Sequence, residues 1–164
     1  MSRRVLVIST FVCAVGLCAA ASKVAGQQQG IEPEGLKVFN LAFHGVDGTT
    51  YDAIYFRPFN FRAEDSARRG HAVQYIAQPI YPWQKLRAEQ PGKYERAIDP
   101  VADPNAWFHV RVVVASPKVS VFVDDAKEPS LVVDQLSNRK KGLVGLWVGN
   151  NSGGDFANLK IVPR

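Results

Sequence analysis

Cysteine is nearly absent from this sequence. The 164 residues include two cysteines, Cys13 and Cys18, and both lie within the first 20 positions. Beyond that segment the chain has no thiol, which excludes disulfides, cysteine-ligated metals and cysteine nucleophiles there. A domain of this size without disulfides must obtain its stability from a hydrophobic core.

Recognisable catalytic motifs are also missing. The sequence has no P-loop, no HExxH, no GxSxG and no dinucleotide-binding fingerprint. Its three histidines, His44, His71 and His109, are far apart along the chain. His109 falls in a predicted strand, where packing or a cross-strand pair is a better interpretation than metal ligation. No motif therefore identifies a reaction or predicts a metal centre.

Only one long apolar run occurs, and it lies at the N-terminus. Arg3 and Arg4 precede an apolar run over residues 5–21, and small residues follow it up to Gly26. This order is typical of a cleaved secretory signal peptide, expected over 1–26. The alternative is an uncleaved membrane anchor, although about 17 residues is at the short limit for crossing a bilayer.

The expected domain organisation follows from this segment. We interpret the polar, glutamine-rich stretch over 27–35 as a flexible leader, and we expect 36–164 to form a single domain. With no other long apolar run, the processed protein should not span a membrane. A secreted, disulfide-free domain is typical of a bacterial export product, so a secreted or periplasmic location is expected.

The positive charge of the chain belongs partly to the N-terminal segment. Residues 27–164 contain 17 basic and 15 acidic residues, so the net charge falls from +5 to +2. The remaining basic clusters, Arg68-Arg69 and residues 139–141, lie next to glycines. We interpret them as solvated turns, and we expect no nucleic-acid partner.

Residues 36–164 consist of short β-prone runs separated by turn residues, with no convincing helical period and no internal repeat. One helical turn is expected at 84–87. Many short strands at this spacing predict an all-β fold, an antiparallel β-sandwich or barrel. The expected strands are Leu36–Phe43, Tyr51–Arg57, His71–Ala77, Tyr94–Ile98, Trp107–Val114, Val119–Val123, Leu131–Asp134, Leu143–Val148 and Phe156–Val162.

Alternation within these strands separates a core face from an outer face. In the strand at 107–114 the even-numbered residues are apolar, and in Val119–Val123 the three valines share one side. The opposite sides are mixed and include Trp107, His109 and Arg111. This pattern favours a sheet with one face in the core and an outer face able to bear a ligand.

The run at 55–61, YFRPFNF, marks where one strand leaves the sheet. Tyr55 and Arg57 share a face, while Ile54 and Phe56 point into the predicted core. Asp52 lies on that same core side, so we expect the strand to enter the core only after its first turn. Pro58 cannot donate to a ladder, so it ends the strand or marks a sheet edge.

A set of aromatic and amide side chains has the composition of a sugar site. Sugars offer apolar C–H faces that stack on rings and hydroxyls that bind amides, guanidinium groups and carboxylates. The alternative is that these rings simply build the sheet, because aromatic residues favour strands. The candidate ligand-binding residues are Tyr55, Arg57, Asn60, Gln74, Tyr75, Trp83 and Trp147.

Catalytic and metal-binding groups are indicated only weakly. A retaining glycosidase needs two carboxylates about 5–5.5 Å apart, and no run of the sequence pairs them. The weak candidates are Asp52, Glu95 and Asp155. The stretch 149–156 offers oxygen ligands for Ca²⁺, but a glycine-rich hairpin turn explains it equally well. We therefore expect no cofactor.

Four segments carry a resemblance to a known family. They are WFHVRVVV at 107–114, VSVFVDD at 119–125, GLVGLW at 142–147 and DFANLKI at 155–161. Together they resemble the C-terminal half of concanavalin A-like/laminin-G-like jelly rolls, above all secreted bacterial proteins of the 3-keto-disaccharide hydrolase domain type. Asp125-Ala126 stands where that family usually has Asp/Asn-Gly. The resemblance covers about 42–163 and lacks the first strands of such domains.

The resemblance implies a concanavalin A-like jelly-roll sandwich, shortened at its N-terminus. From the residues and the family together, the first expected function is carbohydrate recognition, as in a lectin. A glycoside-acting hydrolase is the alternative that the resemblance implies. A third alternative is an envelope scaffold or protein-interaction domain.

Overall fold

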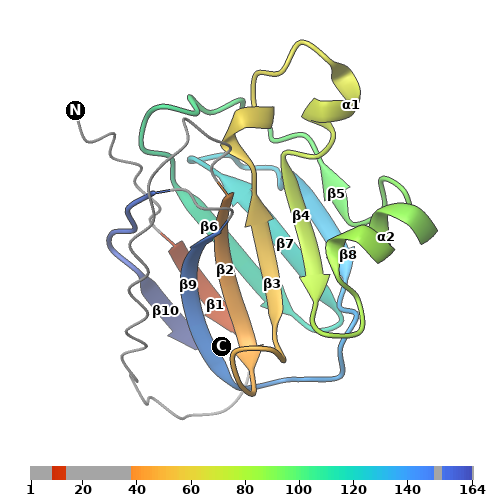
Figure 1. Ribbon diagram of the computed structural model, residues 1–164. Coiled ribbons are helices and arrows are strands. Elements are labelled where there is room, and N and C mark those ends of the chain that lie inside the picture. Colours follow the sequence, from red (N-terminus) through yellow and green to blue (C-terminus); the bar gives the residue numbers. More distant parts are fainter. Residues whose placement is uncertain (1–8, 14–37, 150–152, 164) are drawn as a thin grey trace.

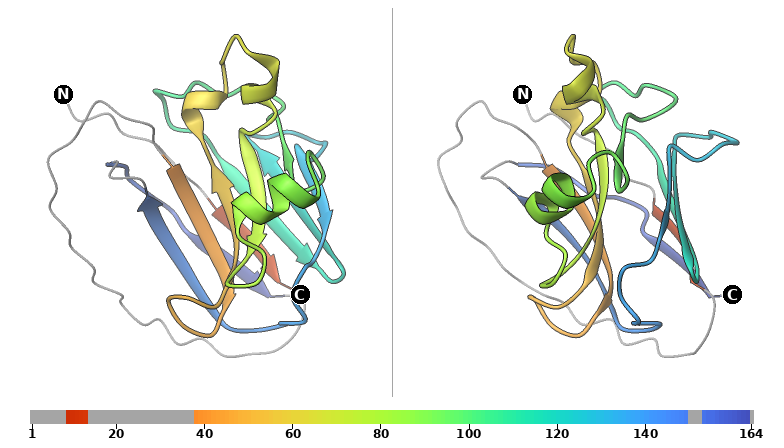
Figure 2. Two further views of the ribbon diagram at one scale, coloured as in Figure 1. Left: turned by 45° about the vertical axis from the view of Figure 1, so that its right-hand side comes forward. Right: turned by 90° about the vertical axis from the view of Figure 1, so that its right-hand side faces the viewer.

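The protein folds as two facing β-sheets. A computed structural model describes residues 9–13, 38–149 and 153–163. Figure 1 looks onto one sheet with the other behind it, and the edge-on view in Figure 2 separates the two layers. The all-β prediction is confirmed, because the described residues form two mostly antiparallel sheets with only short helices.

Ten strands and three short helical segments follow one another along the described chain. They are β1 (Ser9–Cys13), β2 (Val38–Gly45), β3 (Asp52–Phe56), the 3₁₀ turn η1 (Pro58–Asn60), α1 (Ser66–Arg69), β4 (Val73–Ala77), α2 (Trp83–Glu89), β5 (Glu95–Arg96), β6 (Val110–Ala115), β7 (Lys118–Val123), β8 (Leu131–Asp134), β9 (Leu143–Gly149) and β10 (Lys160–Pro163).

The strand order combines sequence neighbours with three pairs that are distant in sequence, β10–β1, β1–β6 and β2–β9. Sheet A has the order β10-β1-β6-β7-β8, and sheet B has the order β5-β4-β3-β2-β9. Every pair in sheet B is antiparallel, as are β6–β7 and β7–β8. β1 is the exception, since it runs parallel to both β6 and β10.

The core lies between the two sheets and follows the predicted alternation. Val110, Val112 and Val114 of β6 are buried, as are the three valines of β7. From sheet B, the rings of Phe39 and Phe56 pack against Phe108 with centroids 6.3 and 5.8 Å apart. Burying such side chains contributes about 1.5–3 kcal/mol each, which is how a disulfide-free domain is stabilised.

All nine expected strands occur, with boundaries shifted by a few residues. The helices were predicted less well. The turn expected at 84–87 is the longer helix α2, and Arg68-Arg69, expected in a turn, ends α1. In α1, Asp65 caps the helix by accepting a hydrogen bond from the Ala67 amide. This capping bond stabilises a helix that is too short to show a helical pattern of apolar residues in the sequence.

A segment over 135–142 carries the chain from sheet A to sheet B. β9 begins after it, where Gly142 has a φ of +150°. A Cβ at Gly142 would overlap the backbone of His44 and Gly45. Only glycine allows the backbone at 142 to lie this close to the backbone of β2. The close contact occurs where the pairing of β2 with β9 shifts register, between Ala42 and Gly45.

The N-terminal part of the chain is described only at β1. This strand falls within the expected signal peptide, and its partners on either side are β6 and β10. The rest of the expected signal and leader lies outside the described residues. No helix in the described part of the chain has both the length and the apolar character needed to cross a membrane.

Candidate functional site

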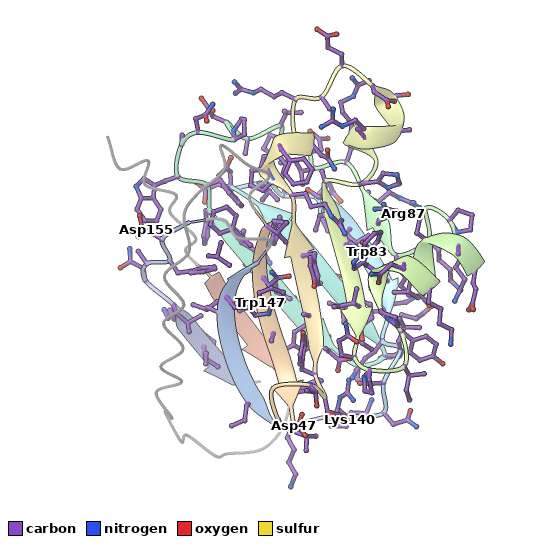
Figure 3. The ribbon with its side chains drawn as sticks, viewed as in Figure 1. Asp47, Trp83, Arg87, Lys140, Trp147 and Asp155 are labelled. Atoms are coloured by element: carbon purple, nitrogen blue, oxygen red, sulfur yellow. The ribbon has the colours of Figure 1, made fainter. Side chains whose placement is uncertain are left out.

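One row of side chains crosses the outer face of sheet B. The register pairs Trp147 with Asn40, Asn40 with Tyr55, Tyr55 with Gln74, and Gln74 with Glu95. Directly paired residues point to the same side of a sheet. Since Leu41 and Ile54 of the neighbouring row are buried between the sheets, this row faces away from sheet A. Figure 3 looks onto it.

Arg57 lies between two aromatic rings at one side of this row. Its guanidinium is 5.5 Å from the Tyr55 ring centroid and 5.8 Å from that of Trp83. Nη2 donates to Gln74 Oε1 at 2.7 Å, and Nη1 donates to the His71 carbonyl at 3.1 Å. The sequence therefore grouped Tyr55, Arg57, Gln74 and Trp83 correctly in space.

Burial changes the ionisation of two groups here. It lowers the pKa of Arg57 to about 10, and repulsion from Arg87 adds to this effect. It also raises the pKa of Tyr55 to about 12, with a further contribution from Tyr51. At neutral pH Arg57 is therefore charged, and the Tyr55 hydroxyl is protonated and able to donate a hydrogen bond.

Helix α2 positions Trp83 and Arg87. It lies against the outer face of sheet B beside β4 (Figure 2), with Leu86 buried at 1% exposure. Trp83 and Arg87 are four residues apart, which brings them to one side of the helix. The Arg87 guanidinium is accordingly 5.0 Å from the Trp83 ring centroid. Trp83 thus lies close to two guanidinium groups.

Glu95 ends the row as a buried carboxylate with two basic neighbours. Arg87 donates to it from Nε at 3.2 Å to Oε1 and from Nη2 at 2.8 Å to Oε2. His71 Nδ1 lies 2.9 Å from Oε2, although without hydrogen-bond alignment. Glu95 was a weak catalytic candidate, and the structure places it beside the predicted ligand-binding residues.

Trp147 is the most exposed ring of the group, at 36%. It meets the Tyr55 ring edge-on, with centroids 5.8 Å apart. Along β9 its neighbours on the same face are Gly145 and Gly149, and a Cβ at Gly149 would overlap the indole. The missing side chain lets the indole lie against the strand backbone.

Two asparagines complete the group. Asn40, which the sequence analysis missed, is 1% exposed between Trp147 and Tyr55, and its Oδ1 has no partner within the described residues. Asn60 in η1 donates a long hydrogen bond of 3.4 Å to the His71 carbonyl. Its buried Oδ1 also has no hydrogen-bond partner within the described residues. The register Asn40–Trp147 was the signal available, but it required knowing that β2 pairs with β9.

We call this group the outer-face cluster. Its members are Asn40, Tyr55, Arg57, Asn60, His71, Gln74, Trp83, Arg87, Glu95 and Trp147.

The remaining predicted residues lie elsewhere. Tyr75 is fully buried and points between the sheets, where its hydroxyl donates to Asp52 at 3.0 Å. Asp155 is exposed on the segment between β9 and β10, well away from Trp83 in Figure 3. Asp52, Glu95 and Asp155 thus occupy three different parts of the fold.

Asp52 is itself fully buried, which corrects the expectation that the strand enters the core only later. Ser137 Oγ donates to it at 2.6 Å and Arg139 Nη2 at 3.2 Å, while His44 Nδ1 lies 3.4 Å away. Burial alone would raise the pKa of Asp52. The interactions with His44, Ser137, Arg139 and Tyr75 lower the pKa by more than burial raises it, so it falls below its usual value. The aspartate ties the 135–142 segment to sheet B.

Among the described residues, no three His, Cys, Asp or Glu side chains come close enough together to bind a metal ion. The calcium alternative concerned 149–156, and residues 150–152 lie outside the described part. His109 lies just before β6 and not within it, so the predicted strand position is wrong. Its Nδ1 is 3.7 Å from a carboxylate oxygen of Asp125, which lies in the turn after β7.

Comparisons of the chain with protein-family models, with curated proteins and with solved structures give no match.

Proposed function

We propose that the protein is a secreted carbohydrate-recognition domain that binds sugars on the outer face of sheet B. The fold we propose for it is the concanavalin A-like jelly roll, in the shortened form that the sequence resemblance implies. The observation that carries the proposal is the cross-strand row itself. In this row the exposed ring of Trp147 and the half-buried ring of Tyr55 alternate with buried amides across four neighbouring strands.

Trp147 is the proposed stacking platform. Of the three rings in the outer-face cluster, Trp83 is engaged by Arg57 and Arg87, and Tyr55 presents its ring to Arg57. Trp147 makes only an edge contact and is the most exposed. A sugar stacked on an indole gains from burying its apolar C–H face.

The hydrogen-bonding groups are proposed to be Asn40, Asn60 and the Tyr55 hydroxyl. The Oδ1 atoms of both asparagines lack a partner within the described chain. An unpaired buried acceptor costs about 1–3 kcal/mol. A ligand hydroxyl that donated to it would recover part of this energy, which favours a polyol ligand over an apolar one.

Recognition is favoured over hydrolysis. Glycoside hydrolysis by two carboxylates needs both at the scissile bond, whereas Asp52 faces the core and Asp155 lies on another segment. Glu95 alone reaches the outer-face cluster, and its oxygens are engaged by Arg87.

A glycan array followed by titration calorimetry tests the proposal. The wild type should bind at least one glycan class, and Trp147→Ala should weaken that binding at least about tenfold, or 1.4 kcal/mol. Gly149→Ala should also weaken glycan binding. It keeps Trp147, but the new methyl group pushes the Trp147 indole out of its position.

The matched control is Phe122→Ala. Phe122 is a ring on the outer face of sheet A, with Arg111 centred 3.6 Å from it. It reproduces an aromatic–arginine pair on the other side of the molecule, so its loss should leave glycan affinity unchanged. Absence of binding to every glycan, or equal effects of Phe122→Ala and Trp147→Ala, would overturn the proposal.

A further inference from the structure

The charges of the outer-face cluster are layered. Glu95 is 2% exposed, whereas the side chains of Arg87 and His71 are 32% and 31% exposed. The carboxylate therefore lies beneath its basic neighbours, and a ligand approaching from solvent meets Arg87 and His71 first. Interactions between exposed charges act over about 10 Å at 0.1 M salt, which is enough to cover this small surface.

Arg87 has hydrogen-bonding capacity to spare. Its Nε and Nη2 are both used by Glu95, while Nη1 has no acceptor within the described residues. A guanidinium presents five N–H donors in a plane and binds oxyanions with two of them at once. The free end of Arg87 next to Trp83 can thus hold a second oxyanion.

The single carboxylate does not balance the positive charge. Arg57 and Arg87 both lie beside Trp83, and their mutual repulsion contributes to the lowered pKa of Arg57. A ligand anion placed between them would relieve that repulsion. The positive field is therefore already present before any ligand binds.

The same asymmetry extends over the surrounding elements. Residues 57–96, which carry η1, α1, β4, α2 and β5, contain eight lysines and arginines against four acidic residues. The remaining described residues contain seven against nine. The positive charge of the described chain is thus concentrated around one end of the Trp147–Glu95 row.

We propose that the glycan recognised by this protein is acidic, with its carboxylate or sulfate group bound at the exposed end of Arg87 and its sugar rings extending toward Trp147. This inference rests on the proposed function and specifies its ligand class. Arg87 acts as the specificity-determining residue, and Glu95 holds it in place.

The experiment compares three oligosaccharides of equal length by calorimetry at low salt. They are a neutral oligogalactoside, an oligogalacturonate and a sulfated oligogalactoside. An acidic oligosaccharide should bind at least about tenfold more tightly than the neutral one, a difference of 1.4 kcal/mol. The preference should shrink at 0.5 M salt, because ions screen the exposed guanidinium.

Arg87→Gln is the test variant and Arg111→Gln the matched control. Both remove one positive charge from an arginine beside an aromatic ring, but Arg111 lies on the outer face of sheet A. The first should weaken binding of the acidic oligosaccharide much more than binding of the neutral one, and so abolish the preference. The second should change neither affinity.

The outcomes separate this inference from the proposed function. Equal or tighter binding of the neutral oligosaccharide would overturn the acidic ligand and leave sugar recognition standing. An equal loss of preference in Arg87→Gln and Arg111→Gln would also overturn it, since net charge alone would then explain the result. If no oligosaccharide binds, both proposals fail. Which acidic oligosaccharide binds better decides between carboxylate and sulfate.

Discussion

Two buried carboxylates on sheet B, Asp52 and Glu95, have similar partners on opposite faces. Each accepts from one arginine and has one histidine nitrogen within 3.4 Å. The partners are His44 and Arg139 for Asp52, and His71 and Arg87 for Glu95. Asp52 faces the core, and Glu95 faces outward.

The difference lies in how completely the partners are engaged. Asp52 also receives bonds from Tyr75 and Ser137, so three segments of the chain meet at one carboxylate. Glu95 binds only partly exposed side chains, one of which keeps a free donor end. The bonds to Asp52 hold separate segments of the fold together. Beside Glu95, the free N–H donors of Arg87 can still bind a ligand.

The largest expected effect is on stability and comes from Asp52→Asn. Removing the charge of one member of a buried ion pair costs about 3–5 kcal/mol. Arg139 loses its counter-charge, and one of the two oxygens that accept from Arg139 and Ser137 is replaced by an amide NH2 group. Urea denaturation should show a loss of about 3 kcal/mol in the free energy of unfolding. The folded variant should retain the glycan affinity that we propose for the wild type. A loss below about 1 kcal/mol would remove the distinction drawn between the two carboxylates.

Glu95→Gln should have the opposite pair of effects, a small loss of stability and a clear loss of ligand affinity. Because Arg87 and His71 are about one-third exposed, water screens their pairing, and the expected loss of stability is about 1 kcal/mol. Arg87 loses its bidentate partner, so the proposed affinity for acidic glycans should fall at least about threefold, or 0.7 kcal/mol. Calorimetry and urea denaturation of the same samples measure both. Unchanged affinity would mean that Glu95 does not position Arg87.

Ser137→Ala should lower stability by about 1.5 kcal/mol, the low end of the range for one hydrogen bond to a charged group. Asp52 keeps Arg139, Tyr75 and His44, so the effect is smaller than that of Asp52→Asn. Thermal unfolding measures it. The double variant Ser137→Ala/Asp52→Asn should lose less than the sum of the two single changes, because both act on one network.

The smallest expected effect is a change in the pH dependence of stability. The folded-state pKa of Asp52 is below its unfolded value, which is about 3.9. Its contribution is therefore fully present above that value and is lost as the pH falls through the lower folded pKa. The stability gap between wild type and Asp52→Asn should stay constant above about pH 5 and narrow below pH 4.

The sequence predicted the strands well because their pattern is local. Alternation in 107–114 and 119–123 places valines on one face whatever the partners are, and the structure confirms these core faces. Asp52 could not be assigned in this way. Its burial depends on Ser137 and Arg139, which are 85 and 87 positions away in the sequence.

Composition predicted most members of the candidate site, and the pairing of the strands adds the member that composition missed. Arg57, Tyr55 and Trp83 were expected to come together, and they do. Asn40 was missed because nothing around it in the chain is unusual, and Tyr75 was included because rings on either face of a strand look alike in composition. Strand pairing decides both cases, and pairing is a property of the folded chain.

The distribution of indoles gives the protein a built-in optical reporter. Two of its three tryptophans, Trp83 and Trp147, belong to the outer-face cluster, and the third, Trp107, packs against the core. Trp147, the most exposed member of that cluster's rings, should emit at longer wavelength than Trp107. A ligand that covers it would shift its fluorescence toward the blue, so occupancy of the outer-face cluster can be followed without any label.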